Sequence, residues 1–154
     1  MSHLRRPAFL LSYRGLFVSP RLSLCGVVVE AGRYLVARRN PGGSQGGKWE
    51  FPGGKQELGE SPQQALIREF AEELAIPVEV GHRLYVGSFT NGTKTYRLEA
   101  WETTLLSREF KLIEHQELRW VLPDEMLRLA LSNSDRQVAV ALAAQTVETV
   151  SQHR

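Results

Sequence analysis

Hydrophobic and polar positions repeat with two different periods along the chain, and the change of period separates helices from strands. Leu66, Phe70 and Leu74 recur every four residues, a spacing that places them on one buried face of a helix. Ser61, followed by a proline and by a glutamine three residues later, predicts the N-cap and first turn of this helix. Pro77 predicts its end, because the residue before a proline is disfavoured in the helical region.

Runs of β-branched and aromatic residues predict strands, and two segments near the C-terminus predict further helices. Ala31-Gly32 and Asn91-Gly92 are turn sequences that each separate two such runs. The expected strands cover residues 23–29, 33–38, 49–51, 78–80, 84–89, 95–105 and 118–121, and the further helices cover 123–129 and 135–150. This order predicts an α/β (α+β) fold in which a mixed β-sheet lies between helices.

The composition is that of an ordinary globular domain, with 154 residues of which 42% are hydrophobic and 23% charged. No apolar run approaches the ~20 residues of a membrane-spanning helix. The single cysteine, Cys25, lies in an apolar run and is interpreted as a reduced core residue, so a disulfide framework is excluded. A net charge of +2 is too small to argue for nucleic acid as a partner. We expect a cytoplasmic protein that is a monomer or a homodimer.

Charge is unevenly distributed at the N-terminus, where no acidic residue precedes Glu30 and four arginines lie within the first 21 residues. An arginine-rich start without acids is also typical of a transit peptide. We instead expect residues 1–21 to form an extension packed on the main domain, which covers residues 22–154. Residues 8–18 favour an additional strand or hairpin, and the sequence does not decide between them.

The first predicted helix also carries three glutamates, Glu69, Glu72 and Glu73, whose i, i+3, i+4 spacing gathers them on a face directed away from the apolar one. Alone, such a triplet is more often a solvated face, because like charges there cost only roughly a few tenths of a kcal/mol. The triplet belongs to a longer pattern, however. This pattern is GKQELGESPQQALIREFAEELAI, from Gly54 to Ile76.

This stretch closely resembles the signature of the Nudix hydrolases. Six fixed identities at roughly 7% usage each match by chance with a probability of order 10⁻⁷ per register. One position departs, because the family usually has glycine where this chain has Ala75. A left-handed residue is favoured at that helix end, so we expect the alanine to cost about 1 kcal/mol or to shift the turn. The six identities are Gly54, Glu60, Arg68, Glu69, Glu72 and Glu73.

The resemblance implies a Nudix-type α/β/α sandwich and a divalent metal site. In Nudix enzymes the glutamates of this motif bind the metal, so Glu69, Glu72 and Glu73 inherit that role, and the carbonyl of Gly53 is a further ligand in close relatives. Converging carboxylates without basic partners need a cation, since two charges ~5 Å apart repel by about 3 kcal/mol at an effective dielectric of 20. Their hard oxygen ligands select Mg²⁺ or Mn²⁺.

The remaining catalytic residues are also implied by the resemblance. Arg68 and Glu60 resemble the pair that holds the metal loop and orients the catalytic glutamate. Two alternatives for the general base stay open: Glu69 in the helix, and an acid from a later loop, where Glu114 has the matching place and is a further candidate metal ligand. We interpret the neighbouring His115 as a solvated loop histidine, although histidine titrates near neutral pH.

The resemblance extends to the substrate side. Residues 46–60, GGKWEFPGGKQELGE, resemble the MutT-type nucleoside triphosphate pyrophosphohydrolases, and residues 92–101, GTKTYRLEAW, resemble the bacterial CTP pyrophosphohydrolase branch. Arg38 and Arg39 end a predicted strand, where a guanidinium would bind the triphosphate through bidentate contacts. Lys55 lies in the signature loop, where it would stabilise leaving pyrophosphate.

The nucleobase is expected at Phe51, Lys94 and Asp135, which lie where relatives contact the base. Asp135 is the most specific of them, because MutT has asparagine at this position and the cytosine-nucleotide branch has aspartate. A carboxylate accepts a hydrogen bond from the exocyclic amine of cytosine. The same residue is equally suited to be the N-cap of the last helix, so both alternatives stay open.

These features predict Mg²⁺-dependent hydrolysis of a (deoxy)nucleoside triphosphate to nucleoside monophosphate and pyrophosphate. By resemblance, the role would be to sanitise the nucleotide pool of oxidised dGTP or cytosine nucleotides. A second alternative is another diphosphate-linked substrate, namely a nucleotide sugar, a dinucleoside polyphosphate or an RNA 5′ end, since the family shares its catalytic helix across these. A third is a non-catalytic Nudix module, against which the complete set of glutamates argues.

Overall fold

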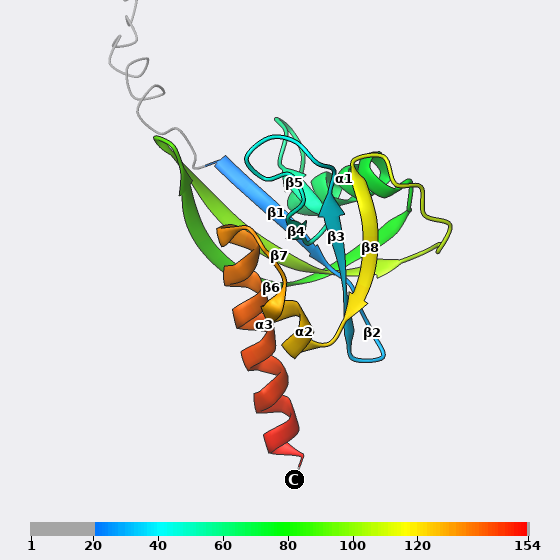
Figure 1. The fold of residues 1–154 in the computed structure, drawn as a ribbon, viewed down its shortest axis with the longest axis vertical. Coiled ribbons are helices and arrows are strands. Elements are labelled where there is room, and N and C mark those ends of the chain that lie inside the picture. Colours follow the sequence, from blue (N-terminus) through cyan, green and yellow to red (C-terminus); the bar gives the residue numbers. More distant parts are fainter. Residues whose placement is uncertain (1–20, 154) are drawn as a thin grey trace, which may run out of the picture.

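The computed structural model describes residues 21–153. Residues 1–20 of the expected N-terminal extension, with its strand or hairpin over residues 8–18, lie outside the described residues, and Arg21 is the first residue of a strand. The described part contains eight strands and three helices (Figure 1). They follow in the order β1 (Arg21–Val27), β2 (Val29–Glu30), β3 (Arg33–Arg39), β4 (Trp49–Glu50), β5 (Gly53–Lys55), α1 (Pro62–Leu74), β6 (Val78–Asn91), β7 (Lys94–Leu105), β8 (His115–Val121), α2 (Pro123–Arg128) and α3 (Asn133–Gln152).

Two four-stranded sheets form the body of the described domain. The first has the strand order β5-β1-β7-β6, and it is mixed, because β1 runs parallel to β7 and antiparallel to β5. The second is antiparallel and centred on β3, which pairs with β2, β4 and β8. The predicted mixed sheet is therefore confirmed, with a second, purely antiparallel sheet beside it.

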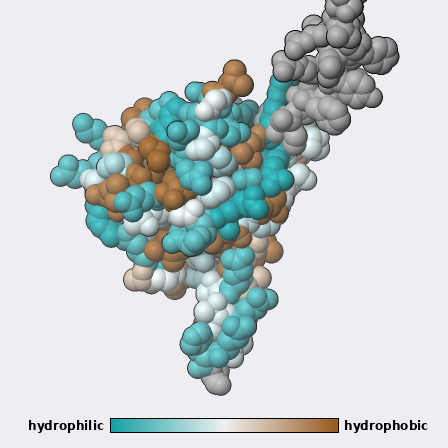
Figure 2. All heavy atoms as spheres, turned by 180° about the vertical axis from the view of Figure 1, so that it is seen from behind, coloured by the Kyte–Doolittle hydropathy of each residue, from teal (hydrophilic) through white to brown (hydrophobic). Residues whose placement is uncertain are grey.

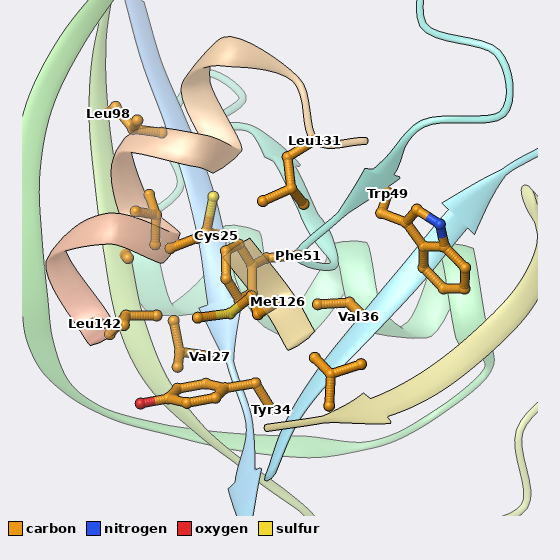
Figure 3. Close-up of a cluster of buried hydrophobic side chains, with 14 residues drawn as sticks. Cys25, Val27, Tyr34, Val36, Trp49, Phe51, Leu98, Met126, Leu131 and Leu142 are labelled. Atoms are coloured by element: carbon orange, nitrogen blue, oxygen red, sulfur yellow. The ribbon is translucent and has the colours of Figure 1, made fainter. Parts of the chain in front are cut away.

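Alternate side chains of the two sheets enter two hydrophobic cores on opposite faces. Leu24 of β1 and Leu35 of β3 pack against α1, whereas Cys25 and Val36 pack against α2 and α3. Figure 3 shows the second core, in which side chains from β1, β3, α2 and α3 gather around Phe51. Helices therefore cover both faces of the sheets, which confirms the expected fold class.

Helix α1 begins and ends where the sequence predicts. The Ser61 hydroxyl accepts from the backbone N–H of Gln64, and the Gln64 side chain accepts from the Ser61 N–H, so that a capping box closes the first turn. The three apolar residues at four-residue spacing are fully buried. Ala75 ends the helix in the left-handed conformation, with φ 54° and ψ 36°, so the turn is kept and the alanine bears the steric cost.

Two strand predictions differ from the structure. The run over residues 23–29 divides at Val28 between the two sheets, because its last residues form the hairpin with β3 while β1 stays in the mixed sheet. The strands expected over residues 78–80 and 84–89 are one continuous β6, whose pairing with β7 becomes irregular at the expected gap. Bulges of this kind accommodate unpaired residues without ending a strand.

Helix α3 starts against the sheets, and its C-terminal part projects beyond the rest of the domain (Figure 1). Figure 2 shows the opposite side of the molecule, where hydrophilic and hydrophobic residues are interspersed. Within residues 21–153, no helix combines the length and apolarity needed to cross a bilayer.

Candidate active site

Strand β5 brings a pair of glycines against helix α1. Gly53 and Gly54 pair antiparallel with Cys25 and Leu24 of β1. A Cβ atom at Gly54 would lie 2.5 Å from the carboxylate of Glu69, and one at Gly53 would lie 2.0 Å from the carbonyl oxygen of Leu24. Glycine at position 53 therefore lets the backbone approach β1 closely, whereas a side chain at position 54 would displace the carboxylate of Glu69.

Arg68 lies at the centre of a network of acidic groups. Its guanidinium donates to both carboxylate oxygens of Glu60, at 2.5 Å and 3.0 Å. The Nη1 group also donates to Glu69 at 2.9 Å and Glu72 at 3.2 Å, and Nη2 donates to the carbonyl of Lys55 at 3.1 Å. The hydrogen bond between Arg68 and Glu60 lowers the pKa of Glu60 and raises the pKa of Arg68, since it stabilises the charged forms of both side chains. The expectation of glutamates without a basic partner is wrong, because Arg68 folds back over them.

Glu73 is buried, so the prediction that all three glutamates face away from the core is wrong for this residue. Its side chain reaches under the β5 loop, where Oε2 accepts from the backbone N–H of Gly53 at 3.3 Å. Burial raises the pKa of Glu73 to about 9, and the charges of Glu50 and Glu69 add to the shift. Burial also raises the pKa of Glu69, against the opposing hydrogen bond from Arg68.

The donor groups of this site fit a hard divalent cation. The carboxylates of Glu69, Glu72 and Glu73 lie on adjacent turns of α1, and repulsion from neighbouring acids contributes to the raised pKa values of Glu69 and Glu73. Within residues 21–153, no group of three or more histidine, cysteine, aspartate or glutamate side chains is arranged so that it could hold a metal ion. Arg68 Nη1 instead donates to one carboxylate oxygen each of Glu69 and Glu72.

Glu114, the second candidate for the general base, is exposed in the loop before β8. Its carbonyl accepts from the backbone N–H of Asn40 at 3.3 Å, which ties this loop to the end of β3. The charge of Glu114 contributes to the raised pKa values of Glu69 and Glu73. The charge of the Glu114 carboxylate is therefore close enough to the acids of α1 to interact with them electrostatically.

A cavity of about 440 Å³ lies beside the glycine pair, within the size range of small-molecule sites. Its walls come from β1, the segment from β3 to β5, the end of β6 and the start of α3. Five of the predicted site residues line this cavity: Arg39, Phe51, Gly53, Lys55 and Asp135. The cavity therefore connects the signature loop at one end with the start of α3 at the other.

Asp135 lies in the first turn of α3 but is not its N-cap. Ser132 holds that position and accepts from the backbone N–H of Asp135, so the capping alternative is wrong. One carboxylate oxygen of Asp135 accepts from the backbone N–H of Phe51 at 3.0 Å and from the Cys25 thiol at 3.9 Å, and the other accepts from the Ser132 hydroxyl at 2.5 Å. Burial raises the pKa of Asp135 to about 6, although these hydrogen bonds oppose the shift.

The predicted phosphate-binding residues differ in their placement. Lys55 lies with its ammonium group 4.9 Å from the centre of the Tyr96 ring, at the cavity wall. Arg39 also lines the cavity, whereas the guanidinium of Arg38 donates to the carbonyl of Gly47 at 3.1 Å and does not line it. Lys94, expected near the base, is exposed at the β6–β7 hairpin and lies outside the cavity wall as well.

Two site residues differ from the sequence prediction or were not predicted. His115 is buried instead of solvated, because its Nε2 forms a 2.8 Å hydrogen bond with Oε1 of Glu50. Glu50 lines the cavity and follows Trp49 in β4. An acid between two large apolar residues, Trp49 and Phe51, is the signal that points to it, since a half-buried charge there requires a partner.

The family model described as NUDIX domain matches residues 24–141. The chain belongs to the Nudix hydrolases. A CTP pyrophosphohydrolase of Escherichia coli (strain K12) is 36% identical to this Nudix hydrolase over 123 residues, which are 79% of this chain and 90% of that protein. An 8-oxo-dGTP diphosphatase of Proteus vulgaris is 54% identical over 44 residues, which are 29% of this chain and 39% of that protein. A crystal structure of a MutT protein from Methanosarcina mazei Go1 has a TM-score of 0.73 at 25% identity, and the match covers 84% of this chain and 98% of that one.

Membership of the family makes this protein a hydrolase and explains why α1 carries the acids described above. Nudix hydrolases generally depend on divalent metal ions, which agrees with the donor chemistry of Glu69, Glu72 and Glu73.

Proposed function

We propose that this Nudix hydrolase converts a nucleoside triphosphate into nucleoside monophosphate and pyrophosphate with the help of Mg²⁺. The observation that carries the proposal is the cavity that extends from the Gly53–Lys55 loop to the buried carboxylate of Asp135. Its cationic groups, Arg39 and Lys55, are offered to a phosphate chain, and Asp135 offers a hydrogen-bond acceptor to a nucleobase. The names of the relatives favour the same substrate class.

In this proposal the metal is held by Glu69, Glu72 and Glu73, together with the carbonyl of Gly53 and with Glu114. Bound there, a divalent cation lowers the pKa of a water molecule and neutralises charge on phosphate oxygens. Mg²⁺ suits the role because it binds through a few carboxylates plus substrate phosphates, and Mn²⁺ has the same ligand preference.

The protein's own groups position the nucleophile and the phosphate chain. Glu69 or Glu114 accepts the proton of the attacking water, and a raised pKa suits Glu69 to this task. Arg68 orients Glu69 while Glu60 holds Arg68 in place. Arg38, Arg39 and Lys55 are the candidate phosphate-binding residues, of which the two that line the cavity are the stronger.

At the other end of the cavity, Asp135 accepts from an amino group or another donor edge of the base, such as that of cytosine or oxidised guanine. Phe51 supports this end through its backbone N–H bond to Asp135. Lys94, on the exposed hairpin outside the cavity wall, is the weaker candidate for a contact with the base. Such a preference suits a role in sanitising the nucleotide pool of oxidised dGTP or cytosine nucleotides.

A nucleotide panel with product identification tests this function. CTP, dCTP, 5-modified dCTP, oxidised dGTP, UTP, a nucleotide sugar and a dinucleoside polyphosphate are incubated with and without Mg²⁺. The expected result is Mg²⁺-dependent release of pyrophosphate, with the highest kcat/KM for a triphosphate whose base presents a donor to Asp135. Faster turnover of the nucleotide sugar or the dinucleoside polyphosphate than of every triphosphate would overturn the proposed substrate class.

A further inference from the structure

Buried His115 and half-buried Glu50 form a hydrogen-bonded pair beside the cavity, and neither residue has a role in the reaction proposed above. Nε2 of His115 lies 2.8 Å from Oε1 of Glu50, while Oε2 of Glu50 accepts from Nη1 of Arg39 at 3.4 Å. Glu50 thus joins a histidine whose side chain is 1% exposed to an arginine whose side chain is 50% exposed. Both Glu50 and Arg39 line the cavity.

The fold places His115 at this point through an irregularity in the second sheet. The register between β3 and β8 shifts after Arg38, so that Arg39 pairs with His115 and Gln116 becomes the extra residue. The side chain of Gln116 then donates to the carbonyl of Arg39 at 2.9 Å. Bulges next to active sites re-aim side chains, and this one directs the imidazole of His115 toward Glu50.

The other ring nitrogen of His115, Nδ1, is buried and has no hydrogen-bond partner within residues 21–153. A carboxylate oxygen accepts, so Nε2 of His115 carries the proton that is donated to Glu50. Within residues 21–153, the bond to Glu50 is therefore the one hydrogen bond of the His115 ring.

His115, Glu50 and Arg39 form a chain of hydrogen bonds, which we call the relay, and its last member is a candidate phosphate-binding residue. Among residues 21–153, Arg39 is hydrogen-bonded to a side chain through Nη1 alone, to Glu50, and its other guanidinium N–H groups have no such partner there. If Glu50 lost its bond to His115, its carboxylate would be free to rotate and to form a closer pair with Arg39. The guanidinium would then be less available to phosphate and less well oriented.

We propose that His115 is a positioning residue for the triphosphate: it fixes the carboxylate of Glu50, which in turn orients Arg39 toward the phosphate chain. The inference rests on the proposed function, since it assigns phosphate binding to Arg39. It implies that loss of His115 weakens binding of the polyphosphate part of a nucleotide and spares the binding of its nucleoside.

The test compares a nucleoside triphosphate with its monophosphate product in the full-length protein. His115→Leu removes the donor, His115→Gln keeps a donor, and His82→Leu is a matched control at an exposed histidine of β6. For His115→Leu we expect KM to rise about tenfold or more, with little change in kcat, since a hydrogen bond to a charged group is lost. The inhibition constant of the monophosphate should stay unchanged, and His115→Gln should recover most of the affinity.

A double-mutant cycle separates this relay from a merely structural role. In an Arg39→Ala background, His115→Leu should cause no further rise in KM, because the residue that it positions is already absent. Additive losses, an equal loss of monophosphate affinity, or an unchanged KM in His115→Leu would each overturn the inference. Glu50→Gln gives a second variant if His115→Leu does not fold. Glu50 accepts from His115 and from Arg39 through different oxygens, and glutamine replaces one of them with an NH₂ group that only donates, so this variant should show the same selective rise in KM.

Equilibrium binding of an α,β-methylene triphosphate analogue distinguishes failure of this inference from failure of the proposed function. Binding by the wild type that is weakened by His115→Leu supports the relay. Binding that His115→Leu leaves unchanged overturns the relay alone, and absence of binding in the wild type overturns the relay and the proposed function together.

Discussion

The buried carboxylate of Asp135 makes the stability of the domain depend on pH in a definite direction. Its pKa is about 6 in the folded protein, against a reference value of 3.8, mainly because burial disfavours the charged form. The perturbation that isolates this group is Asp135→Asn. The amide keeps the shape and an oxygen that accepts from the backbone N–H of Phe51, but it does not titrate.

The sign follows from proton binding in the two states. Because folding raises this pKa, the folded protein binds the proton more tightly than the unfolded chain does. The resulting stability is fully present below pH 3.8 and is lost as the pH rises through about 6. The shift of about 2 pKa units (6 − 3.8) corresponds to about 3 kcal/mol at about 1.36 kcal/mol per unit.

Urea unfolding of both proteins from about pH 3.5 to about pH 7.5 measures this effect. Other acids titrate in both proteins, so they cancel in the difference between the two free energies of unfolding. That difference should move by up to about 3 kcal/mol in favour of Asp135→Asn as the pH rises, with most of the change between about pH 4 and 6. Parallel curves, or a movement in favour of the wild type, would refute the assignment of a raised pKa to Asp135.

Three further predictions concern helix α1 and its metal. Ala75→Gly should raise the free energy of unfolding by about 1 kcal/mol, since it removes an alanine in the left-handed conformation. Ala71→Gly, in the exposed interior of the helix, should lower the free energy of unfolding by about as much. Urea unfolding in which both free energies change in the same direction would contradict this. Glu72→Gln and Glu73→Gln should each lower kcat by orders of magnitude at saturating nucleotide while circular dichroism stays that of the folded protein, and near-wild-type turnover would remove that residue from the metal site. A chelator should abolish turnover and leave the helix content unchanged, because α1 is held by its apolar face; turnover that persists in chelator would contradict metal dependence.

The parts of the fold that the sequence predicts well are those with local signals. The capping box at Ser61, the apolar spacing of α1 and the turn at Ala31-Gly32 each involve residues within four positions of one another. The division of residues 23–29 between two sheets has no such signal. It depends on which strands pair with each end of the run, and this is decided by contacts distant in sequence.

The same distinction applies to the site. The signature of α1 identifies the acids, but the burial of Glu73 depends on the β5 loop that covers it. The environment of His115 depends on a bulge against β3 and on Glu50, which lies 65 positions away in sequence. Ser132 caps α3 because the helix begins at Asn133, and one oxygen of Asp135 accepts instead from the backbone N–H of Phe51, a residue distant in sequence. Pattern and spacing carry no information on these long-range partners.

The position of bond cleavage tests the proposed reaction most directly. Attack of water on the β-phosphorus forms a bond between the water oxygen and that phosphorus and breaks the bond to the oxygen that bridges the α- and β-phosphates, which leaves with the monophosphate. Hydrolysis of the best nucleoside triphosphate in ¹⁸O-labelled water should therefore place the label in pyrophosphate and none in the monophosphate, as read by mass spectrometry. Label in the monophosphate, or orthophosphate as the first product, would contradict the proposed reaction.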